Sequence, residues 1–248
     1  MAVNNQKGFT LIEMMMALVI GLMITAATYA TYSSQQKAYQ TQDQVAEMQQ
    51  NLRAAFYLII EEIQMAGYDP EDKGTFSVTF AMTGRIQFET DKNEDGVDTW
   101  ETIDLGLSPS DDADGNGIPD ADSDGDGVPD RVTIVIQTFD PDGDGIPDPG
   151  RDSDGNGVPE PEDIAENIQA VEFSYLDSAG TNLAIPPPDL SAIRSVQITI
   201  LAIAERSDPK FINSITYTTP SGQNWGPYND NFRRRLLTTT IKCRNLGI

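Results

Sequence analysis

The first thirty or so residues constrain this chain most, because a short polar leader runs directly into an apolar segment. The leader ends at Lys7 and Gly8, and the residues from Phe9 to about Ala30 are almost all apolar. Roughly 20 apolar residues, at about 1.5 Å of helix each, span a hydrocarbon core of about 30 Å. We therefore expect residues 9–30 to form a single membrane-spanning helix.

The position of the small residue at the end of the leader distinguishes this segment from an ordinary secretory signal. Such a signal places its small-residue cleavage site after the apolar region, whereas Gly8 stands before it. Cleavage after Gly8 would keep the apolar segment and make Phe9 the new N-terminus. Lys7 on the N-terminal flank predicts a cytoplasmic leader, with the residues after Tyr32 exported.

The run from Gly8 to Glu13, Gly-Phe-Thr-Leu-Ile-Glu, resembles the prepilin peptidase site of type IV pilins and of the pseudopilins of type II secretion. The resemblance implies cleavage after Gly8 and N-methylation of the Phe9 amine by the prepilin peptidase/methyltransferase. It also implies residence in the bacterial inner membrane with a periplasmic head, followed by assembly with other pilin or pseudopilin subunits through the N-terminal helix.

Glu13 is an acid inside an otherwise apolar span. An ionisable side chain in a membrane helix costs about 2.5 to 3.5 kcal/mol on insertion scales, so Glu13 needs an explanation. One interpretation places it near the membrane edge, where its carboxylate reaches water. The pilin resemblance implies the other: Glu13 pairs with the Phe9 amine of a neighbouring subunit and sets the axial register during assembly.

The helix is predicted to continue beyond the membrane span as an amphipathic helix. Gly67 and Pro70 supply the stop, since glycine accepts a left-handed cap and proline cannot continue a helix. A helix over residues 9–66 would be about 85 Å long, which suits a filament subunit. One face carries apolar residues at three- and four-residue spacing: Val45, Met48, Leu52, Ala55, Phe56, Ile59, Ile63 and Ala66.

The remaining residues, 68–248, are predicted to form one β-rich head. Residues 76–82 and 85–89 alternate around the turn signal Thr83-Gly84, which indicates a hairpin. The expected fold class is therefore α+β and pilin-like, with a leader (1–8), a membrane or filament-core helix (9–30), an amphipathic continuation (31–67) and an antiparallel sheet with Asp-rich insertions. Further strands are expected at 131–139, 168–176, 195–204 and 236–243.

The C-terminal part resembles the end of the PilW-like minor pilins. The residues that carry this resemblance are Val196–Ile200, Asp230–Leu236, Thr238–Ile241 and Arg244-Asn245. It implies a minor rather than a major subunit of a type IV pilus.

The negative charge of the chain is concentrated in one segment. The formal net charge is −23, from 16 basic and 39 acidic residues. Residues 91–163 hold 23 of the acids and three of the bases, so that segment alone carries 23 minus 3, or −20. Such a block asks for a specific explanation, because a diffuse acidic surface would indicate only solubility.

The acids of this segment recur in repeats of the form Asp-x-Asp-Gly-Asp/Asn-Gly-Ile/Val-Pro-Asp/Glu. They start at Asp112, Asp122, Asp140 and Asp152, and a looser copy starts at Asp91. Side-chain oxygens at positions 1, 3 and 5, a glycine at 6 and a backbone carbonyl at 7 are what a calcium loop uses. The predicted calcium ligands are Asp91, Asn93, Asp95, Asp112, Asp114, Asn116, Ile118, Asp120, Asp122, Asp124, Asp126, Val128, Asp130, Asp140, Asp142, Asp144, Ile146, Asp148, Asp152, Asp154, Asn156, Val158, Glu160 and Asp163.

These repeats are not EF-hands, because the acid that EF-hands carry at position 12 is present only in the last repeat, as Asp163. They resemble the Asp-rich calcium repeats of the thrombospondin type 3 and dockerin kind, which implies several calcium ions that stabilise the sheet. Magnesium fits less well because it prefers a rigid octahedron that keeps several waters. The alternative is a solvated Asp/Gly/Pro linker, against which strict repetition and the strand pattern of 131–139 argue.

The remaining features exclude several classes of protein. A single cysteine, Cys243, excludes an internal disulfide, and the chain has no histidine, phosphate loop or nucleophile motif. We therefore expect no enzyme and no nucleic-acid binding, since residues 233–235 are three arginines in a strongly acidic protein. Three functions stay open: a minor pilin, a J-like pseudopilin of type II secretion, and a calcium-dependent adhesin displayed on a pilin stem.

Overall fold

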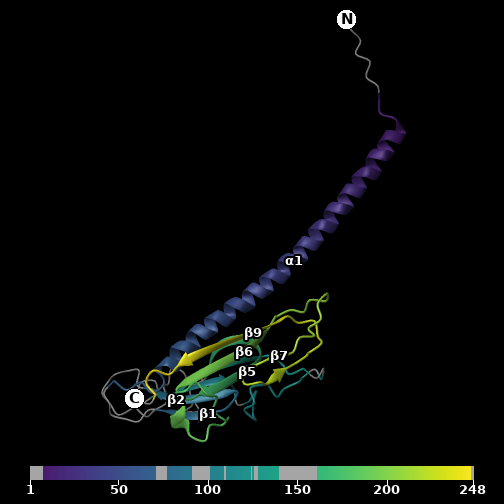
Figure 1. Ribbon diagram of the computed structural model, residues 1–248. Helices are drawn as coiled ribbons and strands as arrows, with labels where there is room; N and C mark the ends of the chain where they lie inside the picture. Colours follow the sequence, from purple (N-terminus) through teal and green to yellow (C-terminus); the bar gives the residue numbers. More distant parts are fainter. Residues whose placement is uncertain are drawn as a thin grey trace, which may run out of the picture. The chain divides into compact units, whose positions relative to one another are not determined.

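The computed structural model describes residues 8–70, 77–90, 101–108, 110–123, 125, 128–139 and 161–246. The chain divides into two compact units, Met1–Gln44 and Val45–Ile248. Helix α1 (Leu11–Met65) contributes its first part to the first unit and its last part to the second. The long N-terminal helix expected from the sequence is confirmed (Figure 1).

The end of α1 has the predicted glycine cap. Gly67 adopts a left-handed φ of 73°, and its N–H donates to the carbonyl of Glu89 at 2.9 Å. The Asn245 amide donates to the carbonyl of Gln64 at 3.1 Å, so the C-terminal residues also hold this end. Burial confirms the predicted apolar face, since all of its members except Val45 are buried. This face is what attaches the second half of α1 to the head.

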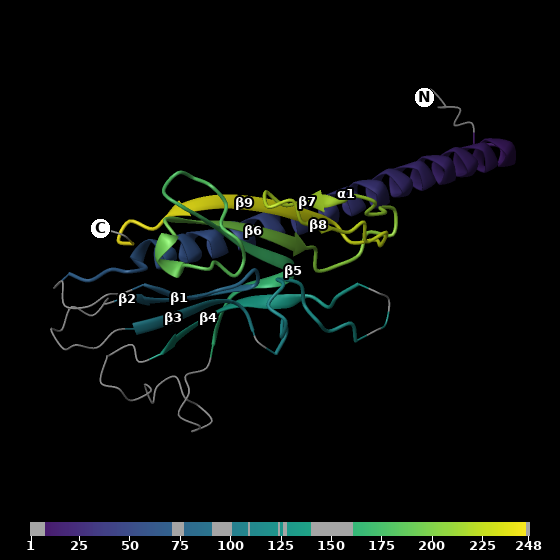
Figure 2. The same cartoon turned by 60° about the horizontal axis from the view of Figure 1, so that its bottom comes forward.

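The head is a seven-stranded antiparallel sheet in the order β1-β2-β3-β4-β5-β6-β9, followed in Figures 1 and 2. A two-stranded sheet, β7-β8, accompanies it, and a short 3-10 helix, η1 (Leu190–Ala192), precedes β6. The strands are β1 (Val78–Ala81), β2 (Arg85–Thr90), β3 (Glu101–Leu107), β4 (Val132–Phe139), β5 (Glu162–Leu176), β6 (Ser195–Ile203), β7 (Tyr217–Thr218), β8 (Asn224–Trp225) and β9 (Arg234–Lys242). The α+β class is confirmed.

The predicted strands are found, β5 starts earlier than expected, and three strands, β3, β7 and β8, were not predicted. β5 begins at Glu162, six residues before the expected start, and it carries an irregularity near Asn167, whose φ is 57°. β3 lies within the acidic segment and was not predicted, although Ile103, Leu105 and Leu107 alternate with Thr102, Asp104 and Gly106. The strand pattern was overlooked because it stands among the Asp-rich repeats. In the structure, β3 pairs with β2 on one side and with β4 on the other, which places it inside the sheet.

The head contains two clusters of buried side chains. The larger one joins α1 to the sheet and includes Phe56, Ile59, Phe88 and Phe173. The smaller one consists of Ala170, Leu201, Tyr217 and Trp225, with Ile118, Tyr228 and Leu236 packed against it. We call it the second core. β5 contributes to both clusters, which explains why all its residues from 168 to 175 are buried.

Candidate functional site

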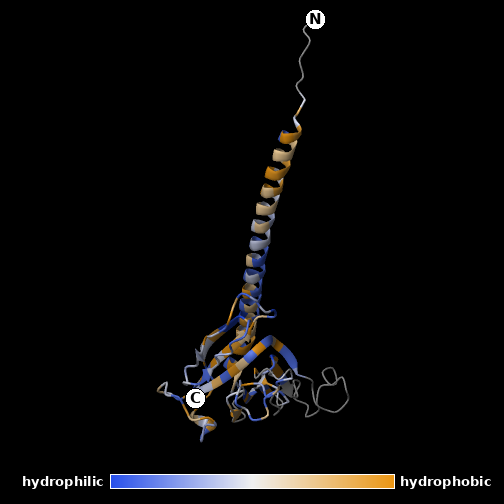
Figure 3. Cartoon of the chain, turned by 90° about the vertical axis from the view of Figure 1, so that its right-hand side faces the viewer, coloured by the Kyte–Doolittle hydropathy of each residue, from blue (hydrophilic) through white to orange (hydrophobic). Residues whose placement is uncertain are grey.

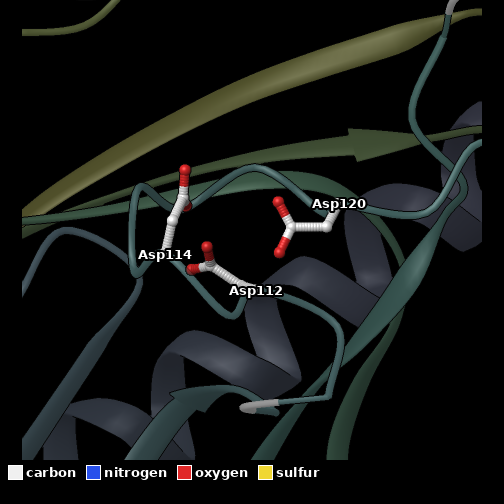
Figure 4. Close-up of side chains that lie close together, drawn as sticks. All are labelled: Asp112, Asp114 and Asp120. Carbon is white, nitrogen blue, oxygen red and sulfur yellow. The ribbon is translucent and has the colours of Figure 1, made fainter.

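Three carboxylates of the first full repeat lie together. Asp112, Asp114 and Asp120 each offer an oxygen within 4.8 Å of the others (Figure 4). Asp112 is buried, with 7% of its surface exposed, whereas Asp114 and Asp120 are exposed. These are positions 1, 3 and 9 of the predicted loop, so folding brings three of its predicted oxygen ligands to one place.

Backbone N–H groups hold these carboxylates. The two oxygens of Asp112 accept from Gly117 N at 2.9 Å and from Asn116 N at 3.0 Å. Asp120 Oδ2 accepts from Ala113 N at 2.7 Å, which closes the loop from position 9 to position 2. The Asn116 amide oxygen accepts from Ile118 N at 2.7 Å, and its Nδ2 donates to Asp114 Oδ2 at 2.7 Å. The backbone of the loop thus donates hydrogen bonds to the side chains of its own acidic residues.

Burial raises the pKa of the Asp112 carboxyl, and the hydrogen bond from Gly117 N partly opposes this rise. The exposed carboxylate of Asp114 adds a like charge beside it. A cation bound among these oxygens would offset both the lost hydration and the repulsion. Hard oxygen donors at this spacing suit a divalent cation such as calcium.

The first loop is docked on the sheet through its glycines. Gly117 O accepts from Val171 N at 2.8 Å, and Gly115 O accepts from Gly84 N at 3.1 Å. A Cβ at Gly117 would lie 1.9 Å from the carbonyl of Val171, and the φ of 82° also requires glycine. The next residue, Ile118, packs its side chain against the second core. The loop is therefore an integral part of the head.

The second repeat closes in the same way, ten residues further on. Asp130 Oδ2 accepts from Ser123 N at 3.2 Å, the counterpart of the bond from Ala113 to Asp120. Asp130 N donates to Ala121 O at 2.7 Å, as Asp120 N does to Asp111 O at 2.7 Å. Asp122 Oδ1 also accepts from Gly125 N at 3.0 Å. Among the described residues, the two successive repeats thus share the bonds that close the loop at position 9, which the sequence pattern predicted only as a spacing.

The other predicted ligands have varied placements. Val128 belongs to the described part of the second loop, and Asp163 lies in β5 opposite Val135 of β4. The rest lie outside the described residues: Asp91, Asn93, Asp95, Asp124, Asp126, Asp140, Asp142, Asp144, Ile146, Asp148, Asp152, Asp154, Asn156, Val158 and Glu160.

At the other end of the chain, the Gly8–Phe9 peptide lies just before α1 begins. Phe9 is 85% exposed, and apart from its chain neighbours no described residue has an atom within 4 Å of where a Cβ on Gly8 would be. Because this bond precedes the first helical residue, Leu11, its backbone is not committed to helical hydrogen bonding. Both residues are thus placed where a processing enzyme could reach them.

Thr10 and Glu13 form a capping box at the start of α1. Thr10 N and Thr10 Oγ1 each donate to Glu13 Oε2 at 2.9 Å, and Glu13 N donates to Thr10 Oγ1 at 3.3 Å. The Thr-x-x-Glu spacing is the usual signature of such a box, so the sequence contained a signal that our interpretation of Glu13 as an assembly residue overlooked. Glu13 therefore has a local structural role in addition to any role between subunits.

The first part of α1 is apolar on all sides. It contains one window that is long and apolar enough to cross a membrane, with a mean hydropathy of 2.0 and no burial within the structure. Figure 3 shows this part mostly in orange, with bluer residues following along the helix. Large side chains such as Leu11, Leu18 and Leu22 are more than 60% exposed. Such a surface needs lipid or other helices as its environment.

Comparison with protein families addresses this N-terminal part. Residues 3–29 match the family described as the prokaryotic N-terminal methylation motif. The chain carries a prepilin-type methylation motif. This motif supports membership of the type IV pilin superfamily and indicates a structural subunit rather than an enzyme. It also implies processing by a peptidase and assembly with other pilins.

Beyond this motif, the chain as a whole has little similarity to known proteins. No curated protein matches the chain. Among solved structures, the chain is similar to a type IV-like pilin from Thermus thermophilus, with 13% identity and a TM-score of 0.45. The similarity covers 80% of this chain and 97% of that pilin.

Two of the three consecutive arginines form ion pairs with acidic side chains. Arg234 donates to both oxygens of Asp230 at 2.7 Å, and Arg233 Nη2 lies 2.7 Å from Asp208 Oδ2. The Asp208 carboxyl has a lowered pKa, chiefly because it accepts hydrogen bonds from Arg233. Arg235 is exposed.

Proposed function

We propose that this protein is a PilW-like minor pilin, a structural and assembly subunit of a type IV pilus whose head is stabilised by calcium. The observation that carries the proposal is the methylation motif at residues 3–29, which runs from the polar leader into the capped, largely apolar first part of α1. A filament subunit needs these parts in this order. The leader directs processing, and the apolar helix serves first the membrane and then the filament core.

In this proposal the N-terminal residues act in sequence. Peptidase cleavage after Gly8 frees the Phe9 amine, which is then methylated. The head stays in the periplasm while residues 9–30 hold the chain in the inner membrane, and residues 31–67 join the two. On assembly, the carboxylate of Glu13 pairs with the Phe9 amine of a neighbouring subunit. Only Oε2 of Glu13 is used in the capping box, so Oε1 is left for this pairing.

The role of calcium is supported by the two loops that the structure describes. Asp112, Asp114 and Asp120 would hold one ion in the first loop, together with the backbone carbonyl of Ile118. The same closure in the second loop supports a second site around Asp122 and Asp130. The first loop is attached to the sheet by backbone bonds and the second by the Gln169 side chain, so ion binding would stabilise the head as a whole.

Processing is tested first, by co-expressing the full chain with a prepilin peptidase and measuring its mass. The expected product begins at Phe9 and carries an N-methyl group. A Gly8→Leu variant should stay uncleaved, whereas a matched change in the leader, Asn5→Leu, should be cleaved normally. An intact wild-type chain, or cleavage at another bond, would contradict the proposal.

A deletion strain separates the minor pilin from the two other functions. Loss of surface pili supports the proposed role, whereas loss of secretion with pili intact would favour a pseudopilin. Loss of attachment with pili intact would favour an adhesin. Complementation of the deletion strain with the Gly8→Leu variant should fail whichever of the three functions is correct, because each of them depends on processing.

Calcium binding is tested by titrating the detergent-solubilised chain and following its thermal unfolding. Calcium at about 100 times its dissociation constant adds about 2.7 kcal/mol of stability, which corresponds to a rise of about 5 to 10 °C in the melting temperature of a head of this size. The double variant Asp112→Asn/Asp122→Asn should lose part of this rise, and Asp43→Asn, on the exposed helix, should not. An equal melting temperature with calcium and with chelator would contradict a calcium role.

A further inference from the structure

We propose that the outer edge of β9 is a docking site for an extended, negatively charged strand of a partner chain, which would add an eighth strand to the sheet. β9 stands at one margin of the seven-stranded sheet, where Figure 2 draws it in yellow. The proposal rests on three observations: the direction of its backbone groups, the contrast with the opposite edge, and the charge of its side chains.

The hydrogen bonds at both ends of β9 show which backbone groups face outward. Ala204 N donates to Arg233 O at 2.8 Å, and Cys243 N donates to Arg194 O at 3.0 Å. In an antiparallel pair every second residue faces the neighbouring strand, so the odd-numbered residues bond to β6. The even-numbered residues therefore direct their N–H and C=O groups away from the sheet: Leu236, Thr238, Thr240 and Lys242.

The chain covers the beginning of this edge itself and then leaves it. Asn213 N donates to Asp230 O at 2.8 Å, and Asn213 Nδ2 donates to Phe232 O at 3.1 Å. From Leu236 to Lys242, no outward backbone group bonds to another backbone group within the described part of the chain. The free edge therefore begins where the internal cover ends.

The opposite edge of the sheet is protected, whereas β9 lacks these protections. β1 has only four residues, and its register with β2 shifts between Val78 and Phe80. A short, bulged strand is a common way to prevent the addition of foreign strands. β9 has nine residues, contains no proline and keeps a continuous register with β6 from Arg234 to Lys242. It is the edge that can accept a long partner strand.

The charge of this edge indicates the chemistry of the partner. Arg235, Lys242 and Arg244 are exposed and form no ion pair with any described residue. Residues 231–248 contain no acid, although the chain as a whole has a net charge of −23. Pairing two copies through β9 would collect these cations from both copies without a carboxylate, which disfavours self-association. An acidic strand would neutralise them.

The spacing of the cations sets the length of the partner strand. From Arg235 to Lys242 the strand extends about 23 Å, with an uncharged centre rich in threonine. A matching strand would have seven or more residues, carboxylates near both ends and β-branched residues between them. Backbone hydrogen bonds would supply affinity, and the terminal charges would supply selectivity.

The test uses the full chain in detergent and a fluorescein-labelled peptide of about nine residues, alternating threonine and valine, with glutamate at both ends. The same peptide with lysine at both ends is the control. We expect the acidic peptide to bind at least about tenfold more tightly. On binding, the amides of Leu236, Thr238, Thr240 and Lys242 should gain protection from hydrogen exchange.

Two variants distinguish edge docking from other binding. Thr240→Pro removes an outward N–H and leaves the backbone bonds to β6 intact. Its side chain also loses the hydrogen bond from Gln197 Nε2 at 3.0 Å, and Thr240→Val, which loses the same bond and keeps the N–H, is the matched control. Only the proline variant should abolish peptide binding, and the two variants should have similar melting temperatures. Arg235→Glu/Lys242→Glu should reverse the preference between the peptides, whereas Arg206→Glu/Lys210→Glu, with the same charge change elsewhere, should not. Equal binding of both peptides, or binding without protection of these amides, would overturn the proposal.

Discussion

The guanidinium of Arg234 donates to the amide oxygen of Gln169 at 2.9 Å, and both side chains are buried. Gln169 in turn donates from Nε2 to the carbonyl of Pro129 at 2.6 Å. Pro129 belongs to the second Asp-rich loop, so one amide connects that loop to the start of β9. Arg131 extends the connection by donating to the carbonyl of Glu205 at 2.8 Å.

The two Asp-rich loops thus both contact residues of the region 204–234 or side chains bonded to it, but through different side chains. The first loop does so through Ile118, which packs against the second core with Tyr217 and Trp225. The second loop does so through Gln169 and Arg131. Any change in these loops on ion binding would therefore be transmitted to residues 204–234, which are distant in sequence.

Arg234→Met should destabilise the head by about 3 kcal/mol, because it leaves Asp230 and Gln169 without their buried partner. The free energy of unfolding in urea measures the effect. Arg235→Met is the matched control, since the neighbouring arginine is exposed and its loss should cost less than about 0.5 kcal/mol. Equal losses in the two variants would contradict a structural role for Arg234.

Trp225 should report calcium binding in a Trp100→Phe background. The indole is 2% exposed and shares the second core with Ile118, so tightening of the first loop should alter its fluorescence emission. Ile118→Ala should retain calcium binding and weaken the emission change, at a cost of about 2 kcal/mol in stability. A calcium-bound chain with unchanged emission would show that the loop and the second core are independent.

Glu13→Gln should separate the capping role of Glu13 from its charge. Glutamine can replace glutamate in a capping box, so the helix start and membrane insertion should persist while incorporation into pili falls sharply. Thr10→Ala makes the opposite change, losing about 1 kcal/mol of capping but keeping the carboxylate. Immunoblots of sheared pili and of membranes measure both. Equal incorporation of Glu13→Gln and wild type would exclude an assembly role for the charge.

The Cys243 thiol should react with alkylating reagents only after unfolding. It is 2% exposed, and burial raises its pKa to about 12 from an ordinary value of 9.0. Since the folded state keeps the proton longer than the unfolded chain, the contribution of this thiol to stability is complete below pH 9 and is lost as pH rises toward 12. Cys243→Ala should flatten this part of the stability profile. Rapid labelling of the native chain at pH 8 would contradict its burial.

Features that depend on neighbouring residues in sequence could be predicted well. The apolar run after Gly8, the amphipathic face of residues 45–66 and the glycine stop at Gly67 follow from helical spacing and backbone freedom, and the structure shows them. The hairpin of β1 and β2 also follows from alternation around a turn. The repeats predicted which acids would approach one another in the first loop, because their ligands lie within nine residues.

By itself the sequence determined the N-terminal methylation motif, the helix and the spacing of the acidic loops, because each is a local pattern. Only the tertiary structure decided that Gly117 and Ile118 attach the first loop to β5 and the second core, and that Gln169 joins Pro129 to Arg234. These contacts join residues at least 40 positions apart, and no periodicity within one segment encodes them. Burial and backbone pairing across the sheet select them.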